Sequence, residues 1–249
     1  MILAMRLLNR IFLVSGLVLL GWMPLFAAET EGEDAPEDFK WQLAKENQLS
    51  YGLLALDGKD RTFYVNAGTF FAPVKASAAR DVYSRYVSNP SKQIKFYTRR
   101  EEDKKVFFNE AFSVDVDGLK DFIIVLMESD AGEILARPID ISLGKMPLSS
   151  LSVVNLSRHN LGLAADKTFA KLDPFDTFSK KYGGDKEEIL ACTLKMYSLK
   201  DPKSPELLLT RTYSFWTSKR IVILYFDMPT ADNTSGRPTN VTMYDRGPR

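Results

Sequence analysis

Short runs of β-forming residues occur twice in this 249-residue sequence, in the same order and about 100 positions apart. Five such echoes have separations between 89 and 101 residues, which is hard to obtain by chance. The separation changes once, and an insertion of about eleven residues in a connection of the second half would explain the change. The echoed runs are 64–66 with 153–155, 95–97 with 195–197, 106–114 with 207–215, 122–126 with 221–225, and 137–138 with 237–238.

A repeat of this length matches a whole β-sandwich domain and is too long for a solenoid unit. Polarity alternates along 107–114, as expected for a strand with one side on a core, and 122–126 is a continuous apolar run typical of a buried strand. Helical periodicity is scarce, with a short helix expected at 39–49 and helical turns at 76–86 and 169–182. The sequence therefore predicts an all-β fold of two tandem, related β-sandwich domains, 39–137 and 138–249, after a signal peptide and with a loose C-terminal tail.

The amino terminus has the pattern of a targeting segment. Arg6 and Arg10 precede an uncharged, mostly apolar run that ends at Ala27 and Ala28. A basic start, an apolar middle and small residues at the end indicate a secretory signal peptide over 1–27. The alternative is an uncleaved membrane anchor, because the run is near the lower length limit for a span. We therefore expect an exported protein, periplasmic or secreted, with no membrane span after cleavage.

The charges of the rest of the chain nearly cancel. The sequence has 33 Lys and Arg residues against 32 Asp and Glu residues, and removal of 1–27 leaves a net charge of 31 − 32 = −1. Phosphate neutralisation needs a clear excess of cations, so no nucleic-acid partner is expected. Residues 28–38 hold six acids and no base, which predicts a flexible acidic leader.

One histidine, His159, and one cysteine, Cys192, limit the chemistry available. A single imidazole excludes sites that need two, and a single thiol excludes an intrachain disulfide and thiolate-rich metal sites. His159 lies in a polar stretch after a strand and is expected in a surface turn. No Gly-x-Ser-x-Gly nucleophile motif is present that would indicate a catalytic triad with it. Cys192 is expected to be buried. Residues 115–118 (Asp-Val-Asp-Gly) begin like a calcium loop but lack its later Gly and Glu. The sequence thus predicts no catalytic residue, metal or cofactor, with a spatial pair of carboxylates as the open alternative.

Two pairs of adjacent aromatic residues, Phe70-Phe71 and Phe215-Trp216, are candidates for binding. Adjacent residues on a strand point to opposite faces, so both members of a pair cannot enter one core. Phe70, Phe71 and Trp216 are therefore expected either to pack between the domains or to form a platform for a partner or a sugar.

The Val-Asn-Leu-Ser strand at 154–157, the tandem arrangement and the signal peptide resemble uncharacterised secreted bacterial proteins with immunoglobulin-like sandwich domains. The two-sandwich arrangement is also similar to that of periplasmic pilus chaperones. We expect a non-enzymatic exported envelope protein that acts as a protein-interaction or scaffold module, with an envelope protein or a surface polymer as partner. The alternatives are a pilus-type chaperone, which predicts a long exposed edge strand in the first domain, and a carbohydrate-binding module or hydrolase. The oligomeric state stays open.

Overall fold

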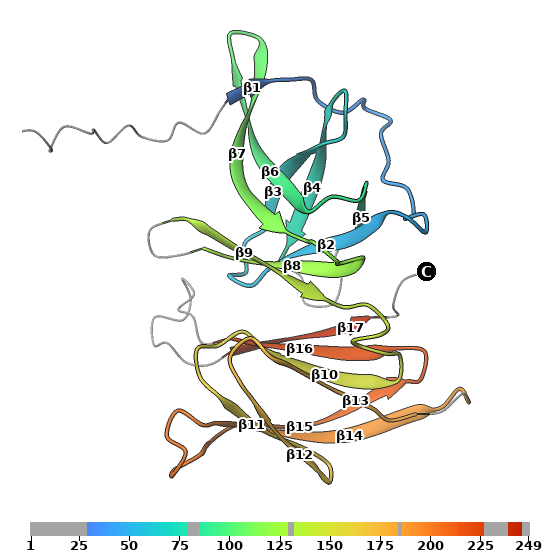
Figure 1. Ribbon diagram of the computed structural model, residues 1–249, viewed down its shortest axis with the longest axis vertical. Coiled ribbons are helices and arrows are strands. Elements are labelled where there is room, and N and C mark those ends of the chain that lie inside the picture. Colours follow the sequence, from blue (N-terminus) through green and yellow to red (C-terminus); the bar gives the residue numbers. More distant parts are fainter. Residues whose placement is uncertain (1–28, 79–84, 129–131, 184–185, 227–238, 246–249) are drawn as a thin grey trace, which may run out of the picture.

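The protein is all-β in the computed structural model, with one large curled sheet and two smaller sheets (Figure 1). The structure describes residues 29–78, 85–128, 132–183, 186–226 and 239–245. These ranges contain seventeen β-strands and no helix, and hence no helix that could cross a membrane. The predicted all-β, sandwich-type fold is confirmed, whereas the predicted signal peptide lies outside the described residues.

The strands up to residue 140 form one curled nine-stranded sheet, which we call the first unit. Their order is β1-β7-β6-β3-β4-β2-β8-β9, and β5 pairs with β2 outside this path. A short parallel pairing of β2 with β4 joins the two halves of the sheet, at Leu53 opposite Ala76 and Leu54 opposite Ser77. The strands are β1 (Glu29–Glu31), β2 (Leu49–Ala55), β3 (Arg61–Asn66), β4 (Phe71–Ser77), β5 (Arg85–Ser88), β6 (Gln93–Glu102), β7 (Lys105–Asp115), β8 (Asp121–Glu128) and β9 (Ile134–Asp140).

The later strands form two separate four-stranded sheets, which we call together the second unit. One sheet has the order β13-β10-β16-β17 and the other the order β12-β11-β14-β15. The strands are β10 (Ser150–Asn155), β11 (Leu161–Ala165), β12 (Thr168–Leu172), β13 (Thr177–Lys181), β14 (Ile189–Ser198), β15 (Glu206–Trp216), β16 (Arg220–Phe226) and β17 (Thr239–Asp245).

The pairings of the two units correspond strand by strand. The parallel pair β2–β8 matches the parallel pair β10–β16, and the antiparallel pairs β8–β9 and β2–β5 match β16–β17 and β10–β13. The antiparallel pairs β3–β4, β3–β6 and β6–β7 match β11–β12, β11–β14 and β14–β15. A β-bulge also recurs 100 residues later, between Phe96 and Tyr97 in β6 and between Met196 and Tyr197 in β14.

This correspondence corrects two of the sequence echoes. Val65-Asn66 lies in β3, whereas Val154-Asn155 lies in β10, the counterpart of β2, so that echo is wrong. No eleven-residue insertion is needed, because β2 and β10 begin 101 residues apart and β3 and β11 begin 100 residues apart. The Arg-Pro echo is also out of register, since Pro138 pairs with Ile124 inside β9 and Pro238 precedes β17.

Each unit has an apolar core of its own. In the first unit the core lies inside the curled sheet and includes the buried side chains of Tyr51, Phe96 and Phe122. In the second unit it lies between the two sheets and includes Val153 and Leu194. Strands β8 and β16 are buried on both faces, because one face joins its own core and the other faces the neighbouring unit. This double burial explains their continuous apolar sequences.

The two units pack on one another through corresponding faces of corresponding strands. Figure 1 shows β2, β8 and β9 of the first unit facing β10, β16 and β17 of the second, and their side chains form one buried cluster. An interface that uses the same patch on both partners has the form of a two-fold, isologous dimer interface. The corresponding pairs in the cluster are Leu54 and Val154, Leu56 and Leu156, Ile123 and Val222, Val125 and Leu224, and Ile139 and Met243.

A buried arginine ties the interface to the linker between the units. Asp121 and Arg220 begin β8 and β16, at corresponding positions, and Oδ2 of Asp121 lies 4.0 Å from Nη2 of Arg220. Arg220 is fully buried and donates hydrogen bonds to the carbonyls of Ile141 and Met146, the latter at 2.6 Å. Asp121 also pairs with Arg85 of β5. The guanidinium thus joins both units and the linker 141–149.

The acidic leader is ordered from residue 29, which corrects the prediction of a flexible segment. Strand β1 pairs with residues 107–109 of β7, and the Phe71 amide donates to the Glu33 carbonyl at 2.8 Å. A Cβ at Gly32 would lie 2.7 Å from the Phe71 ring, so glycine permits this close approach. The acids find basic partners on the β6–β7 hairpin, which explains the order: Asp34 pairs with Arg99, Glu29 with Arg100 and Glu31 with Lys105.

The predicted helices are also wrong within the described residues. Residues 39–48 form an irregular connection, and 169–182 contain parts of β12 and β13. In the third predicted helical segment, 76–86, residues 79–84 lie outside the described residues. Residues 76–77 belong to β4 and residues 85–86 to β5. The sequence-based boundary at 137/138 falls inside β9. Strand β17 pairs with β16, and the last residues of the predicted loose tail, 246–249, lie outside the described residues. Strand pairing across the sheets outweighs the weak local helical spacing in these segments.

Candidate functional site

The Val-Asn-Leu-Ser segment at 154–157 has a structural role. The buried side chain of Asn155 donates through Nδ2 to the carbonyls of His159 (2.8 Å) and Asp173 (3.1 Å). Its Oδ1 accepts hydrogen bonds from the backbone N–H (3.0 Å) and the hydroxyl (2.7 Å) of Ser157. These bonds hold the turn that contains His159, and a turn was predicted at that residue. The Ser157 hydroxyl is used in these hydrogen bonds.

Cys192 lies inside the core of the second unit. Burial, with the nearby charge of Asp166, raises the pKa of its thiol to about 11. Because the thiolate is the reactive form of cysteine, this thiol lacks the activation that nucleophilic catalysis needs. The position matches the predicted buried cysteine.

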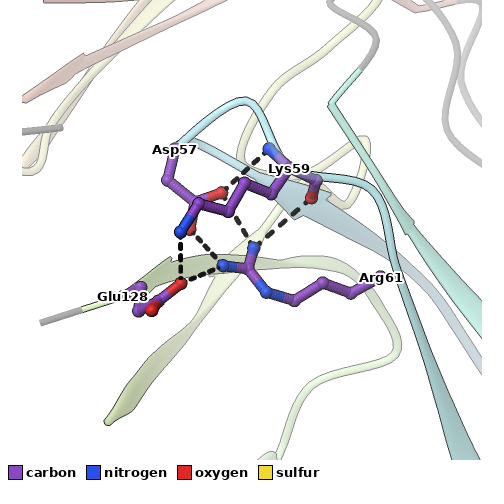
Figure 2. Close-up of polar contacts among 4 residues, drawn as sticks. All are labelled: Asp57, Lys59, Arg61 and Glu128. Carbon is purple, nitrogen blue, oxygen red and sulfur yellow. Dashed lines mark hydrogen bonds and ion pairs between the residues drawn. The ribbon is translucent and has the colours of Figure 1, made fainter. Parts of the chain in front are cut away.

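Asp57 and Glu128 form a carboxylate pair of the kind that a hydrolase would require in a cleft. Both carboxylates contact Nη2 of Arg61, at 2.7 and 2.5 Å, and Lys59 also contacts Glu128 at 2.9 Å (Figure 2). Burial alone would raise the pKa of Asp57, but hydrogen bonds from Arg61 and the Lys59 amide hold it below its usual value. Hydrogen bonds from Lys59 and Arg61 likewise lower the pKa of Glu128. A general acid needs a raised pKa, so this pair suits a structural clamp between the β2–β3 turn and β8.

The clamp predicts a defined pH dependence of stability. A carboxylate with a lowered pKa stabilises the folded state above its unfolded pKa of about 4, and this stabilisation is lost as the pH falls through the folded value. Wild type should therefore melt at a higher temperature than Asp57→Asn at pH 7, and the gap should be smaller at pH 3. Thermal melting at both pH values measures it. Glu187 is an exposed carboxylate outside the clamp, so the difference in melting temperature between wild type and Glu187→Gln should not depend on pH in this way. A difference between wild type and Asp57→Asn that is the same at both pH values would contradict the prediction.

The three predicted binding residues do not form one site. Phe71 is buried beneath the leader, where its ring stacks on Phe108 with centroids 3.9 Å apart. Phe70 packs edge-on against Phe39, at 5.2 Å. Trp216 lies at the end of β15 in the second unit and is 44% exposed. None of the three belongs to the cluster between the units, so the expected packing between domains is not observed at these residues.

Trp216 belongs to a larger exposed surface, the outward side of the sheet β12-β11-β14-β15, which we call the apolar face. Cys192, Leu194 and Met196 of β14 point into the core, so their neighbours on that strand point outward. The strand register places large exposed apolar side chains near both ends of this face, with small side chains and the exposed Lys195 between them. Outward positions include Phe169, Leu207 and Tyr197 near one end, Ile189 and Trp216 at the other, and Ala164, Ala191, Thr193, Thr212 and Ser214.

Phe169 is the most prominent side chain of the apolar face. It is 79% exposed. In the sheet it pairs with Ala164 of β11, and Ala164 pairs on its other side with Lys195 of β14. Six residues separate Lys195 from Ile189 along β14, so the two apolar ends are about 20 Å apart at the usual rise of a strand. The sequence did not single out Phe169, because the expected helical turn at 169–182 obscured the alternation of β12.

The corresponding face of the first unit carries Phe71 and Phe108, which the leader covers at Gly32, together with polar side chains. Its outward positions include Thr62 opposite Lys75, and Lys95, whose ammonium pairs with Glu110 at 2.8 Å. The leader therefore covers aromatic side chains on this face of the first unit, whereas the apolar side chains on the corresponding face of the second unit are exposed.

A small cleft lies between the units on another side. Its volume is about 360 Å³, and the guanidinium of Arg137 lies over the ring of Phe175 at 3.9 Å from the centroid. Burial lowers the pKa of Arg137. Phe175 has a positive φ of 68°, held by the loop that Asn155 anchors. This contact joins β9 to the second unit by a cation–π interaction.

No protein-family model matches the chain, and no curated protein matches it. Within the part of the chain that the structure describes, no group of three or more His, Cys, Asp or Glu side chains is placed to hold a metal ion.

Proposed function

We propose that this protein is an exported, non-enzymatic interaction module of the cell envelope, whose apolar face binds a protein partner. The apolar face carries the proposal, because soluble proteins seldom leave large apolar side chains grouped on one surface unless that surface binds something. Four of them, Phe169, Ile189, Leu207 and Trp216, share this sheet. The side chains between them are small apart from Lys195, which leaves room for a flat partner with an acidic group to pair with that lysine. The basic and apolar pattern of residues 1–27 supports export.

In this proposal the two units are copies of one ancestral sandwich. The matching pairings, the bulges 100 residues apart and the interface between corresponding faces support a duplication. Each copy uses one layer of strands to hold the other copy, β2, β8 and β9 in the first unit and β10, β16 and β17 in the second. The opposite faces are then free to diverge, which accounts for the leader-covered face of the first unit and the exposed apolar face of the second.

The alternative functions find less support. A hydrolase needs one carboxylic acid with a raised pKa, whereas the pKa values of Asp57 and Glu128 are lowered. A pilus-type chaperone would need a long exposed edge strand in the first unit, where β1 covers part of β7. The eleven-residue edge strand β15 belongs instead to the second unit.

Phe169→Asp tests the proposed surface. A charge on the apolar face should weaken capture of the partner from envelope extract at least about tenfold, since exposed aromatic anchors dominate interface energies. The free energy of unfolding should change by less than about 0.5 kcal/mol, because the site is exposed. Capture is measured by quantitative mass spectrometry, and a photo-crosslinking residue at position 169 should mark the same partner.

Leu43→Asp is the matched control, because Leu43 is 78% exposed but lies in the connection before β2. It should leave capture unchanged. Equal loss of capture in the two variants, or retention of only a polysaccharide that neither variant affects, would exclude the proposed protein-binding face.

A further inference from the structure

Phe169 of the apolar face occupies the position that Phe71 has in the first unit. The recurring β-bulge fixes this comparison, because a tyrosine follows it directly in β6 and in β14. Crossing from that tyrosine to the paired strand, moving two residues along it and crossing again leads to Phe71 in one unit and to Phe169 in the other. The residue pairs on this path are Tyr97 with Tyr64 and Asn66 with Phe71 in the first unit, and Tyr197 with Gly162 and Ala164 with Phe169 in the second.

The leader binds Phe71 through its backbone as well as its ring. The Phe71 amide donates to the Glu33 carbonyl at 2.8 Å, and the Ala35 amide donates to the Phe71 carbonyl at 3.0 Å. Asp34, between these two leader residues, forms a parallel β-bridge with Phe71. Gly32 passes close to the ring. The leader thus adds a short extended segment to a free side of β4, which is the binding mode called strand addition.

The corresponding side of β12 is open in the part of the chain that the structure describes. Strand β12 pairs with β11 and forms one edge of its four-stranded sheet. Because Phe71 directs its N–H and C=O away from β3 toward the leader, Phe169 directs these groups away from β11 at the same ladder position. The Phe169 ring is 79% exposed and lines a shallow groove of about 310 Å³ with Tyr197. An edge of this kind is a template for another strand.

Lys195 gives this surface a preference for acids. It corresponds to Lys95, whose ammonium pairs with Glu110 at 2.8 Å. Glu110 lies opposite the tyrosine that follows the bulge, and at that position the second unit has Leu207. Among the described residues Lys195 has no ion-pair partner. It lies in the same row of the sheet as Phe169, two strands away, so an acidic side chain bound there gains a partner.

We propose that the edge of β12 at Phe169 binds an extended acidic segment of the partner protein by strand addition. This inference rests on the proposed function and names the part of the partner that the apolar face receives. The backbone of the segment bonds to the N–H and C=O of Phe169, as residues 33 and 35 bond to Phe71. A small residue crosses the Phe169 ring, as Gly32 crosses its counterpart, and an acidic side chain reaches Lys195.

An NMR titration of the isotope-labelled full chain with a synthetic peptide tests the proposal. The peptide has the sequence of leader residues 29–38, with six acids and Gly32. Saturable shifts are expected in β11, β12 and β14, with a dissociation constant below about 1 mM. At saturation the Phe169 amide should exchange with solvent at least about tenfold more slowly, because a hydrogen bond protects it. A control peptide with Lys at the acidic positions should bind at least about threefold more weakly.

Variants separate the contributions of the ring, the backbone and the charge. Phe169→Ala removes the ring. Phe169→Pro removes the ring and the N–H, and proline is tolerated where an edge strand directs its N–H outward. The dissociation constant of the acidic peptide should rise at least about threefold in Phe169→Ala, and at least about threefold further in Phe169→Pro. Lys195→Gln should abolish the preference for the acidic peptide, whereas the matched variant Lys95→Gln should keep it.

Three results of the titration would overturn the proposal. They are no saturable shift, shifts at Phe71 in place of Phe169, and a Phe169 amide that stays unprotected at saturation. Equal affinities of Phe169→Ala and Phe169→Pro would exclude strand addition, and exchange of the wild-type amide decides the matter if the proline variant unfolds. A concentration-dependent dimer that Phe169→Pro abolishes would place the leader of a second copy on β12 and overturn the assignment to another protein.

Failure of this inference is distinguishable from failure of the proposed function. Capture of a partner that Phe169→Asp weakens, combined with any of these contrary results, would leave the apolar face as a binding surface and remove the acidic strand. Peptide binding at β12 without capture of a protein that Phe169→Asp affects would contradict the proposed function alone.

Discussion

Arg220→Ala should lower the free energy of unfolding by about 3–5 kcal/mol, the usual cost of breaking a buried charge pair. The substitution leaves the carbonyls of Ile141 and Met146 without their donor and removes one of the two cations near Asp121. Because Arg220 is fully buried, water cannot replace the lost bonds. Urea denaturation followed by fluorescence measures the change.

Two controls accompany this variant. Arg220→Lys keeps the charge but cannot reach both carbonyls with a planar fork, so an intermediate loss is expected. Lys59→Ala removes an exposed partner of Glu128 and should cost less than about 1 kcal/mol. A loss for Arg220→Ala as small as that for Lys59→Ala would show that the guanidinium does not hold the linker and the units together.

Leu224→Asp should separate the two units while leaving each one folded. Leu224 is buried and belongs to the cluster between the units, not to the core of the second unit. A buried, unpaired carboxylate there should cost at least about 4 kcal/mol, and the interface can relieve this cost by opening. We expect two unfolding transitions in place of one in calorimetry, and a larger radius of gyration in small-angle scattering.

Ile223→Asp is the matched control, one residue away on the opposite face of β16. Ile223 belongs to the core of the second unit, so its charge should unfold that unit rather than detach it. Rapid proteolysis within 150–245 should then follow. If both variants behave alike, the two faces of β16 do not serve separate cores.

The two strands that are buried on both faces, β8 and β16, were the easiest part of the fold to predict. Residues 122–126 and 221–226 are apolar throughout, and the structure places them in β8 and β16. The register of the echoes was harder, because runs as short as Val-Asn recur wherever a strand ends. Only the pairings identify β10 as the counterpart of β2, since parallel partners can lie many residues apart in sequence.

The leader and the candidate sites depended on long-range contacts. Six acids in a row of ten are typical of a solvated segment, and nothing near them in sequence indicates the basic hairpin about 70 residues later. Phe70 and Phe71 were singled out as adjacent aromatic residues, yet the first packs against Phe39 and the second lies beneath Gly32. Phe169, which has no aromatic neighbour in the sequence, is more exposed than Trp216, at 79% against 44%.

The amino-acid sequence was sufficient for the all-β class and for most of the strands, because alternation of polar and apolar residues and turn-forming residues act over a few positions. It could not say which apolar faces meet. A strand face that enters a core, a face that packs on the neighbouring unit and a face left open to a partner carry the same kinds of side chain. Which of these three environments a strand face enters depends on the surface that packs opposite it in the folded chain, and that surface lies tens of residues away in the sequence.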